Sequence, residues 1–190
     1  MLLETIKIED GEVFNLLYHQ KRVDRSRKRL YNSKDILNLS AIIKPFRHKG
    51  LYRCRIIYGE ELQSIEYIPY TPKQIESIHI VSSEIEYGLK YLYRDELNNL
   101  LKISEADEVI IEKNGLLTDT TIANIALYDG NRWWTPKTPL LQGTMRAKLL
   151  SKGFLHTKNI KKEDLLQYSH LALMNAMIGF KILKREVVKL

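Results

Sequence analysis

The stretch Tyr87-Gly88-Leu89-Lys90-Tyr91-Leu92-Tyr93-Arg94 decides the interpretation of this chain, because it places one lysine among apolar and aromatic residues. Most lysines are solvated surface groups, and the chain has many others. Removing water from an ammonium group disfavours its charged form, and the neutral amine is a nucleophile. Lys90 is therefore the candidate for a covalent role.

Three further motifs follow Lys90 in order. Asp119 precedes Asn124 by five residues, and it could instead cap the turn at Asn114-Gly115. Gly143 would let the backbone approach a ligand closely, with the N–H groups of Thr144 and Met145 pointing from a helix start at a phosphate. The alternative is an ordinary glycine before a helix. Asn175 ends an apolar run, where it could also be a turn residue.

Upstream, Arg22 lies in the motif His19-Gln20-Lys21-Arg22-Val23, within a run of six basic residues from Lys21 to Arg29. The run could be a solvated helix face, a face with one functional arginine, or a nucleic-acid site. A planar guanidinium binds two phosphate oxygens at once, which suits Arg22 to phosphate binding. The net charge of +7 also fits a protein that holds an anionic cofactor and a carboxylate substrate.

Composition narrows the class of protein. The chain has 190 residues, of which 44% are apolar, so a folded core is expected. No apolar run approaches the roughly 20 residues that span a bilayer. No secretory signal, paired-cysteine zinc spacing or metal site is expected, and Cys54 is the single cysteine. A cytoplasmic protein that binds neither membrane nor nucleic acid is the expectation.

Hydrophobic patterning predicts a small α/β domain at 1–72 and a larger strand-rich domain at 73–190, joined near the linker at 69–72. In the first helix, Leu16, Leu17, Val23 and Leu30 are the expected core positions. Tight turns at Asp10-Gly11, Asn114-Gly115 and Asp129-Gly130 indicate hairpins and an antiparallel-rich sheet. The expected strands cover 2–8, 51–58, 62–67, 77–81, 108–112, 124–128, 132–134, 171–173 and 180–188. The expected helices cover 14–31, a short segment after Ser33, 94–103, 144–150 and 163–168.

In order and spacing, these motifs resemble the fold-type IV pyridoxal-phosphate enzymes: the branched-chain and D-amino acid aminotransferases and aminodeoxychorismate lyase. The resemblance covers nearly the whole chain. It implies a two-domain α+β fold of the D-amino acid aminotransferase kind, a homodimer, and pyridoxal 5′-phosphate between the domains. Leu3-Glu4-Thr5-Ile6-Lys7 resembles a family motif that normally lies further from the start. An N-terminally truncated member is therefore the expectation.

By this resemblance, Lys90 forms the Schiff base with the cofactor, and Asp119 bonds the protonated pyridine nitrogen. Arg22, Gly143, Thr144, Met145 and Asn175 are expected to contact the cofactor, chiefly its phosphate. The chain departs from the family pattern at two of its motifs. Tyr93 stands where the family usually has Asn, and Asp119 stands where it has Glu.

The small-molecule amino substrate stays open at this stage. The run from Lys90 to Arg94, and Met145 in the glycine motif, resemble aminodeoxychorismate lyase, which releases 4-aminobenzoate and pyruvate. The alternatives are a D-amino acid or branched-chain aminotransferase, or a non-catalytic paralogue.

Overall fold

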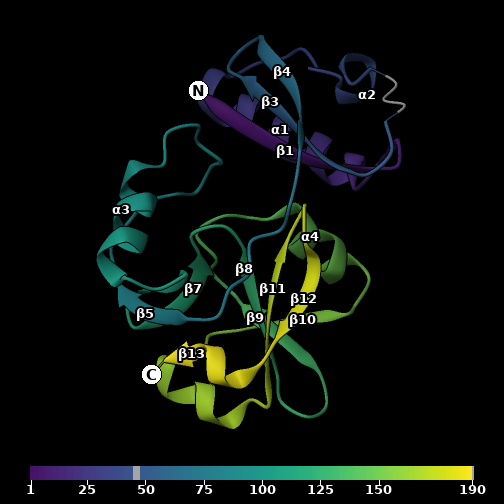
Figure 1. The fold of residues 1–190 in the computed structure, drawn as a ribbon. Helices are drawn as coiled ribbons and strands as arrows, with labels where there is room; N and C mark the ends of the chain where they lie inside the picture. Colours follow the sequence, from purple (N-terminus) through teal and green to yellow (C-terminus); the bar gives the residue numbers. More distant parts are fainter. Residues whose placement is uncertain (45–47, 190) are drawn as a thin grey trace. The chain divides into compact units, whose positions relative to one another are not determined.

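The computed structural model describes residues 1–44 and 48–189, which form two compact units (Figure 1). Unit 1 comprises Met1–Pro72 and Leu89–Tyr93, and unit 2 comprises Lys73–Gly88 and Arg94–Leu190. The first segment of unit 1 ends at Pro72. Unit 1 also includes Leu89–Tyr93, the short segment that carries Lys90, so one boundary in the sequence does not divide the chain into the two units.

Unit 1 is a four-stranded antiparallel sheet in the order β2-β1-β3-β4, with two helices. Asp10 and Gly11 both have positive φ, which a tight turn between β1 and β2 requires and which glycine adopts without strain. The elements are β1 (Leu2–Glu9), β2 (Glu12–Val13), α1 (Leu16–Tyr31), α2 (Leu39–Ile42), β3 (Leu51–Tyr58) and β4 (Leu62–Pro69).

The buried face of α1 differs from the expected one. Val23 is buried, but Leu17 and Leu30 are exposed by 61% and 41%. The other buried side chains of α1 are polar or charged: His19, Arg22, Ser26 and Arg27. Apolar periodicity was the wrong guide here, because the helix buries ion pairs and hydrogen bonds rather than leucines.

The short helix expected after Ser33 does not form there. Helix α2 begins at Leu39, and Asn38 caps it by accepting hydrogen bonds from the N–H groups of Ser40 and Ala41. Arg27 instead binds both the backbone oxygen and the carboxylate of Asp35. These contacts hold the Asp35 backbone in a non-helical conformation.

Unit 2 contains a nine-stranded mixed sheet that follows the path β10-β9-β8-β7-β6-β5-β13, with β11 pairing β8 and β12. Most neighbouring pairs are antiparallel, and β5 and β6 form a parallel pair connected through α3. The elements are β5 (Ile78–Ser82), α3 (Asp95–Ser104), β6 (Glu108–Lys113), β7 (Leu116–Thr120), β8 (Asn124–Tyr128), β9 (Trp133–Pro136), α4 (Thr144–Ser151), β10 (Leu155–Lys158), the 3-10 helices η1 (Lys162–Gln167) and η2 (Arg185–Val187), β11 (His170–Asn175), β12 (Gly179–Leu183) and β13 (Val188–Lys189).

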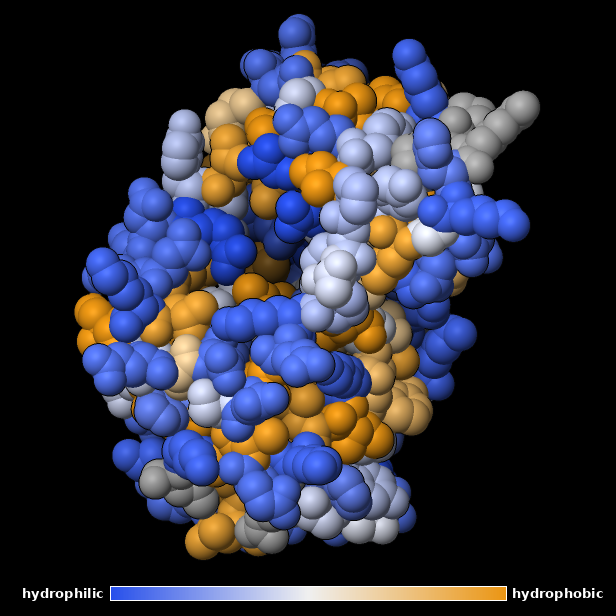
Figure 2. Space-filling view, viewed as in Figure 1, coloured by the Kyte–Doolittle hydropathy of each residue, from blue (hydrophilic) through white to orange (hydrophobic). Residues whose placement is uncertain are grey.

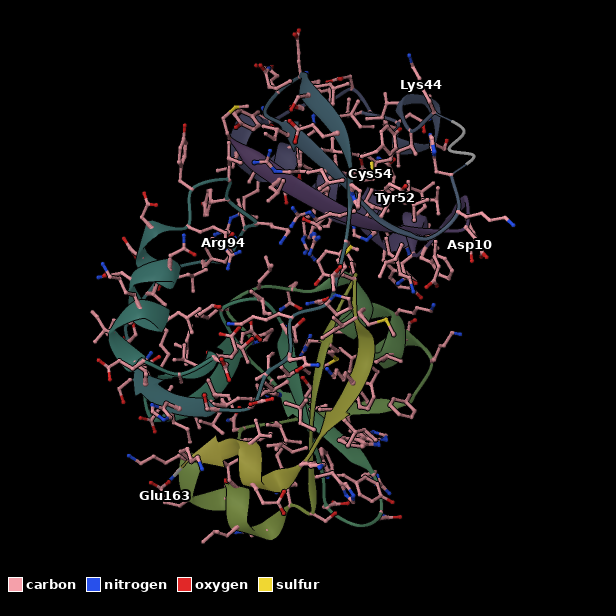
Figure 3. The ribbon with its side chains drawn as sticks, in the orientation of Figure 1. Asp10, Lys44, Tyr52, Cys54, Arg94 and Glu163 are labelled. Atoms are coloured by element: carbon pink, nitrogen blue, oxygen red, sulfur yellow. The ribbon has the colours of Figure 1, made fainter. Side chains whose placement is uncertain are left out.

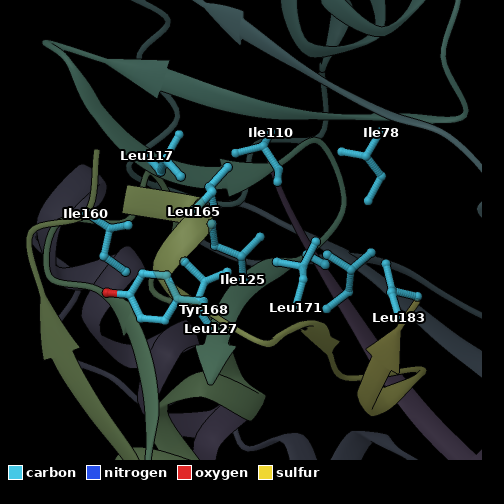
Figure 4. Close-up of a cluster of buried hydrophobic side chains, with 12 residues drawn as sticks. Ile78, Ile110, Leu117, Ile125, Leu127, Ile160, Leu165, Tyr168, Leu171 and Leu183 are labelled. Carbon is cyan, nitrogen blue, oxygen red and sulfur yellow. The ribbon is translucent and has the colours of Figure 1, made fainter. Parts of the chain in front are cut away.

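The core of unit 2 lies where apolar residues of several strands meet (Figure 4). Ile110, Ile125 and Leu173 are fully buried there. The hairpin between β6 and β7 turns at Asn114 and Gly115, both with positive φ, as the sequence predicts. The strand expected at 180–188 is shorter, because β12 ends at Leu183 and the chain then turns through η2 to pair β13 with β5.

The surface carries no continuous apolar band on the visible face: hydrophilic and hydrophobic residues are interspersed on both units (Figure 2). Within residues 1–44 and 48–189, no helix is both long and apolar enough to cross a membrane.

Candidate functional site

Glu4 is a buried carboxylate on the core face of β1. Alternate residues of β1 point into unit 1, so Glu4 lies between the buried side chains of Leu2 and Ile6. Its side chain is 0% exposed. A buried charge of this kind is stable only with a close partner of opposite charge.

Two residues of α1 bind this carboxylate. Arg22 donates from Nε to Oε1 over 2.7 Å and from Nη2 to Oε2 over 2.6 Å, a bidentate pair. His19 Nδ1 lies 2.5 Å from Oε2. Because Glu4 is ionised, the proton of this bond belongs to His19.

The protonation states of Glu4 and His19 depend on their contacts with each other and with Arg22. Burial alone would raise the pKa of Glu4, but Arg22 and His19 outweigh it and lower that pKa to about 2. Burial lowers the pKa of His19, and the bond to Glu4 opposes this only in part. At neutral pH the cluster is therefore an ionised Glu4–Arg22 pair with a neutral imidazole.

Lys90 belongs to the same unit and is attached to the start of β1. Its backbone oxygen accepts a 2.9 Å hydrogen bond from Leu3 N, and Leu92 N donates to Met1 O. Leu89 is buried in the core of unit 1. The positive charge of Lys90 also contributes to lowering the pKa of His19. Arg22 and Lys90, predicted from separate motifs, thus lie around one cluster.

Unit 2 holds a second buried carboxylate, Asp119, near the end of β7. It is 4% exposed, and burial raises its pKa to about 7. Asn124 Nδ2 donates to Oδ1 over 2.7 Å, and Leu141 N donates to Oδ2 over 2.8 Å. A backbone hydrogen bond from Leu140 and the charge of Arg146 oppose this rise in pKa only in part. The sequence alternative, a cap on the Asn114-Gly115 turn, does not match these bonds.

Gly143 is a glycine because Asn124 lies against it. A Cβ at Gly143 would fall 1.9 Å from Asn124 Oδ1, far inside contact distance. Gly143 precedes α4, which begins at Thr144 with Met145 in its first turn. The glycine therefore lets the N-terminus of α4 pack against Asn124, which binds Asp119. A helix N-terminus favours anions.

Arg146, which was not among the predicted site residues, connects the start of α4 to Thr135 and Pro136 of β9. Its guanidinium is buried and donates to Pro136 O over 2.9 Å, to Gln142 Oε1 over 3.0 Å and to Thr135 Oγ1 over 3.4 Å. Burial lowers its pKa, which Asp119 partly opposes. Arg146 fixes the start of α4 against β9.

The turn between Asp119 and Asn124 is held from three sides. Arg94, labelled in Figure 3, donates to Thr121 O over 2.5 Å. Glu108 Oε1 accepts from both Thr121 N and Thr121 Oγ1. Asn175 donates to Ile122 O, and its Oδ1 accepts from Met177 N and Ile178 N. These bonds of Asn175 are those of a turn residue, the alternative left open by the sequence.

Glu4 is the main residue that the sequence-based selection missed. A signal was present: Glu4 occupies an inward position of the alternating strand 2–8. It precedes His19 by 15 residues and Arg22 by 18. Of the six basic residues between Lys21 and Arg29, Arg22 and Arg27 are buried in ion pairs, and the other four are exposed. The basic run is thus mostly a solvated face with two structural arginines.

Comparison with known proteins identifies the family of the chain. The family model for Amino-transferase class IV matches residues 1–184. A Haemophilus influenzae protein named "Uncharacterized protein" is 38% identical over 185 residues, 94% of this chain and 98% of that one. A Schizosaccharomyces pombe protein named "Putative aminodeoxychorismate lyase" is 28% identical over 92% of this chain and 85% of its own length.

Solved structures agree on the fold. The crystal structure of a "putative 4-amino-4-deoxychorismate lyase" from Haemophilus somnus 129pt is 39% identical, with a TM-score of 0.87 over 94% of this chain and 96% of that one. A pyridoxal-phosphate-bound "hypothetical aminotransferase" from Mycobacterium tuberculosis has a TM-score of 0.80 at 15% identity, over 96% of this chain and 79% of that one, which shows the fold alone. The expected fold-type IV α+β fold is confirmed. The chain belongs to the class IV aminotransferase family and is an enzyme that depends on pyridoxal 5′-phosphate.

Proposed function

We propose that this enzyme is an aminodeoxychorismate lyase, which converts aminodeoxychorismate into 4-aminobenzoate and pyruvate. Two relatives carry this name in provisional form, at 39% and 28% identity and over most of both chains. The Lys90–Arg94 run and Met145 of the glycine motif support the same choice.

Asp119 is the observation that carries the site assignment. It is a buried carboxylate that accepts hydrogen bonds from neutral donors: the amide of Asn124 and the backbone of Leu140 and Leu141. A carboxylate has about four lone-pair sites, so it can accept a further bond. A protonated pyridine nitrogen is a cation that would stabilise the ionised form of Asp119. The residues present therefore fit the cofactor.

Each unit by itself carries residues that fit part of the cofactor. In unit 2, Asp119 would bind the ring nitrogen, and the N–H groups of Thr144 and Met145 at the start of α4 would bind phosphate. In unit 1, Arg22 would bind phosphate and Lys90 would form the covalent bond. Asn175 would act near Ile122, through the turn that follows Asp119.

The bound cofactor supplies an electron sink for the electron pair left when the substrate loses a proton from the carbon that bears its amino group. Lys90 would take that proton as general base, since its amine is released when the substrate amine replaces it. Asp119 would keep the proton on the ring nitrogen. In the lyase reaction, the neighbouring carbon–oxygen bond would break and the substrate ring would become aromatic. Lys90 would return its proton to the leaving enolate, which is released as pyruvate.

Product analysis tests the proposal. Purified enzyme should release 4-aminobenzoate and pyruvate from aminodeoxychorismate in equal amounts, and Lys90→Ala should release neither. In parallel, D- and L-amino acids are supplied with 2-oxoglutarate. Turnover of these pairs without pyruvate release from aminodeoxychorismate would replace the lyase by an aminotransferase.

We also propose that the enzyme is a homodimer, as the family resemblance implies. Unit 2 exposes Phe154 and Ile182 by 44% and 53%, apolar surface of the kind that dimers cover. Sedimentation equilibrium should give twice the 22.3 kDa chain mass. A monomer mass across the micromolar range would contradict this.

A further inference from the structure

We propose that Glu4 is a positioning residue for cofactor binding: its carboxylate fixes the plane and place of the Arg22 guanidinium so that Arg22 can bind the phosphate. The inference rests on the phosphate role proposed above for Arg22. It adds a residue that touches no cofactor atom and acts only through its neighbour.

Geometry is the first support. Arg22 contacts Glu4 through two nitrogens, Nε and Nη2, at 2.7 and 2.6 Å. Two parallel bonds to one carboxylate fix the orientation of a planar guanidinium as well as its position. A single contact would leave rotation about the bond open.

Burial is the second support. Glu4 is 0% exposed and Arg22 is 6% exposed, so neither side chain can exchange its partner for water. Glu4 is itself fixed by its place on β1, whose backbone pairs with β3 along its whole length. The orientation of Arg22 is therefore set by a strand that is paired along its whole length.

The third support is the place of Lys90. Its backbone is bonded to Leu3, the residue before Glu4, and its charge is felt by His19, which binds Glu4 Oε2. Lys90 and Arg22 are thus held by neighbouring residues of β1, Leu3 and Glu4. Shortening the side chain of residue 4 by one methylene would therefore shift the Arg22 guanidinium relative to Lys90.

A cofactor-affinity ratio tests this role. Equilibrium dialysis of the cofactor-free protein gives the affinity for pyridoxal phosphate and for pyridoxal, which lacks the phosphate. Glu4→Asp keeps the charge and both acceptor oxygens but shortens the reach. It should lower the affinity for pyridoxal phosphate by about 10- to 100-fold and leave that for pyridoxal within about threefold. Glu9→Asp, the same change at an exposed position of β1, is the matched control and should alter neither.

Arg22→Lys completes the design, because an ammonium cannot form the bidentate pair. If Glu4 acts through Arg22, the double variant Glu4→Asp/Arg22→Lys should lose no more selectivity for the phosphate than the worse single variant. Additive losses would show two independent roles and overturn the inference. An equal loss for both ligands in Glu4→Asp would also overturn it, since that marks a purely structural residue.

The design separates this inference from the proposed function. If Arg22→Lys leaves the preference for pyridoxal phosphate unchanged, the phosphate role of Arg22 fails. If Arg22→Lys loses the preference and Glu4→Asp keeps it, only the positioning role of Glu4 fails. Thermal unfolding of each variant establishes that it is folded, and Glu4→Asp keeps a carboxylate opposite Arg22.

Discussion

At the residue scale, two of the buried carboxylates, Glu4 and Asp119, have opposite electrostatic environments. Glu4 is held ionised by Arg22, and its pKa falls to about 2. Asp119 is held by neutral donors, and burial raises its pKa to about 7. The first arrangement stabilises the protein without a ligand, whereas the second suits a site completed by a cation.

The Glu4–Arg22 pair should respond to single and double substitution very differently. Arg22→Met leaves a buried carboxylate without its cation, which costs about 3–5 kcal/mol of unfolding free energy. Arg22→Met/Glu4→Gln removes both charges and should recover most of that loss. Urea unfolding measures both, with Arg55→Met and Arg55→Met/Glu66→Gln on the exposed pair as controls, where changes stay within about 1 kcal/mol. Equal stability of the single and double variants would contradict the pairing.

The raised pKa of Asp119 predicts a pH dependence of stability in the cofactor-free enzyme. Between its unfolded pKa of 3.8 and its folded pKa of about 7, the folded state binds more protons than the unfolded state. The contribution of Asp119 to stability is therefore present below about pH 4 and is lost as pH rises through about 7. Asp119→Asn should remove this part of the pH dependence, as thermal unfolding from pH 4 to 8 would record.

Asp129 provides a control of opposite sign. Hydrogen bonds from Arg132, Trp134 and Asn131 lower its pKa to about 2. Asp129→Asn should therefore change the dependence only as pH falls below about 4, through the lowered pKa. If Asp119→Asn and wild type share one profile between pH 4 and 8, Asp119 is not the enclosed carboxyl described above.

At the element scale, the start of α4 and the turn between β7 and β8 are packed so closely that Gly143 allows no side chain. Gly143→Ala should displace Asn124 and with it the bond to Asp119. We expect at least a tenfold loss of turnover, with the order of magnitude set by misplacement of a catalytic group. Gly59→Ala is the control, because its Cβ would come no closer than 3.4 Å to its neighbours, the side chains of Tyr31 and Met1. Full activity in Gly143→Ala would mean that Asn124 has no part in the site.

Local sequence predicted the elements whose chemistry is local. Asn114-Gly115 specifies its turn by backbone conformation alone, and β3 and β4 follow from runs of β-branched and aromatic residues. The sequence did not predict the buried face of α1, because hydrophobic periodicity identifies apolar positions only. Arg22 is buried because it pairs with Glu4, eighteen residues away in the sequence. The helix expected after Ser33 does not form for a similar reason: Arg27 of the preceding helix α1 binds the carboxylate of Asp35.

At the scale of the whole molecule, the candidate residues fall into two sets. Arg22 and Lys90 belong to unit 1, and Asp119, Gly143, Thr144, Met145 and Asn175 belong to unit 2. Motif order along the chain predicted the members of both sets. It could not predict that the Lys90 segment returns to unit 1, since that depends on backbone pairing between residues 2 and 91.

The most direct test of the central claim is to locate the cofactor on the chain. The purified holoenzyme is reduced with borohydride, digested, and analysed by mass spectrometry, with Lys90→Ala treated in the same way. We predict one phosphopyridoxyl group per chain, on the peptide that contains Lys90, and none on the variant. A group on any other lysine, or an equally labelled Lys90→Ala protein, would contradict the assignment of Lys90 and the site built around it.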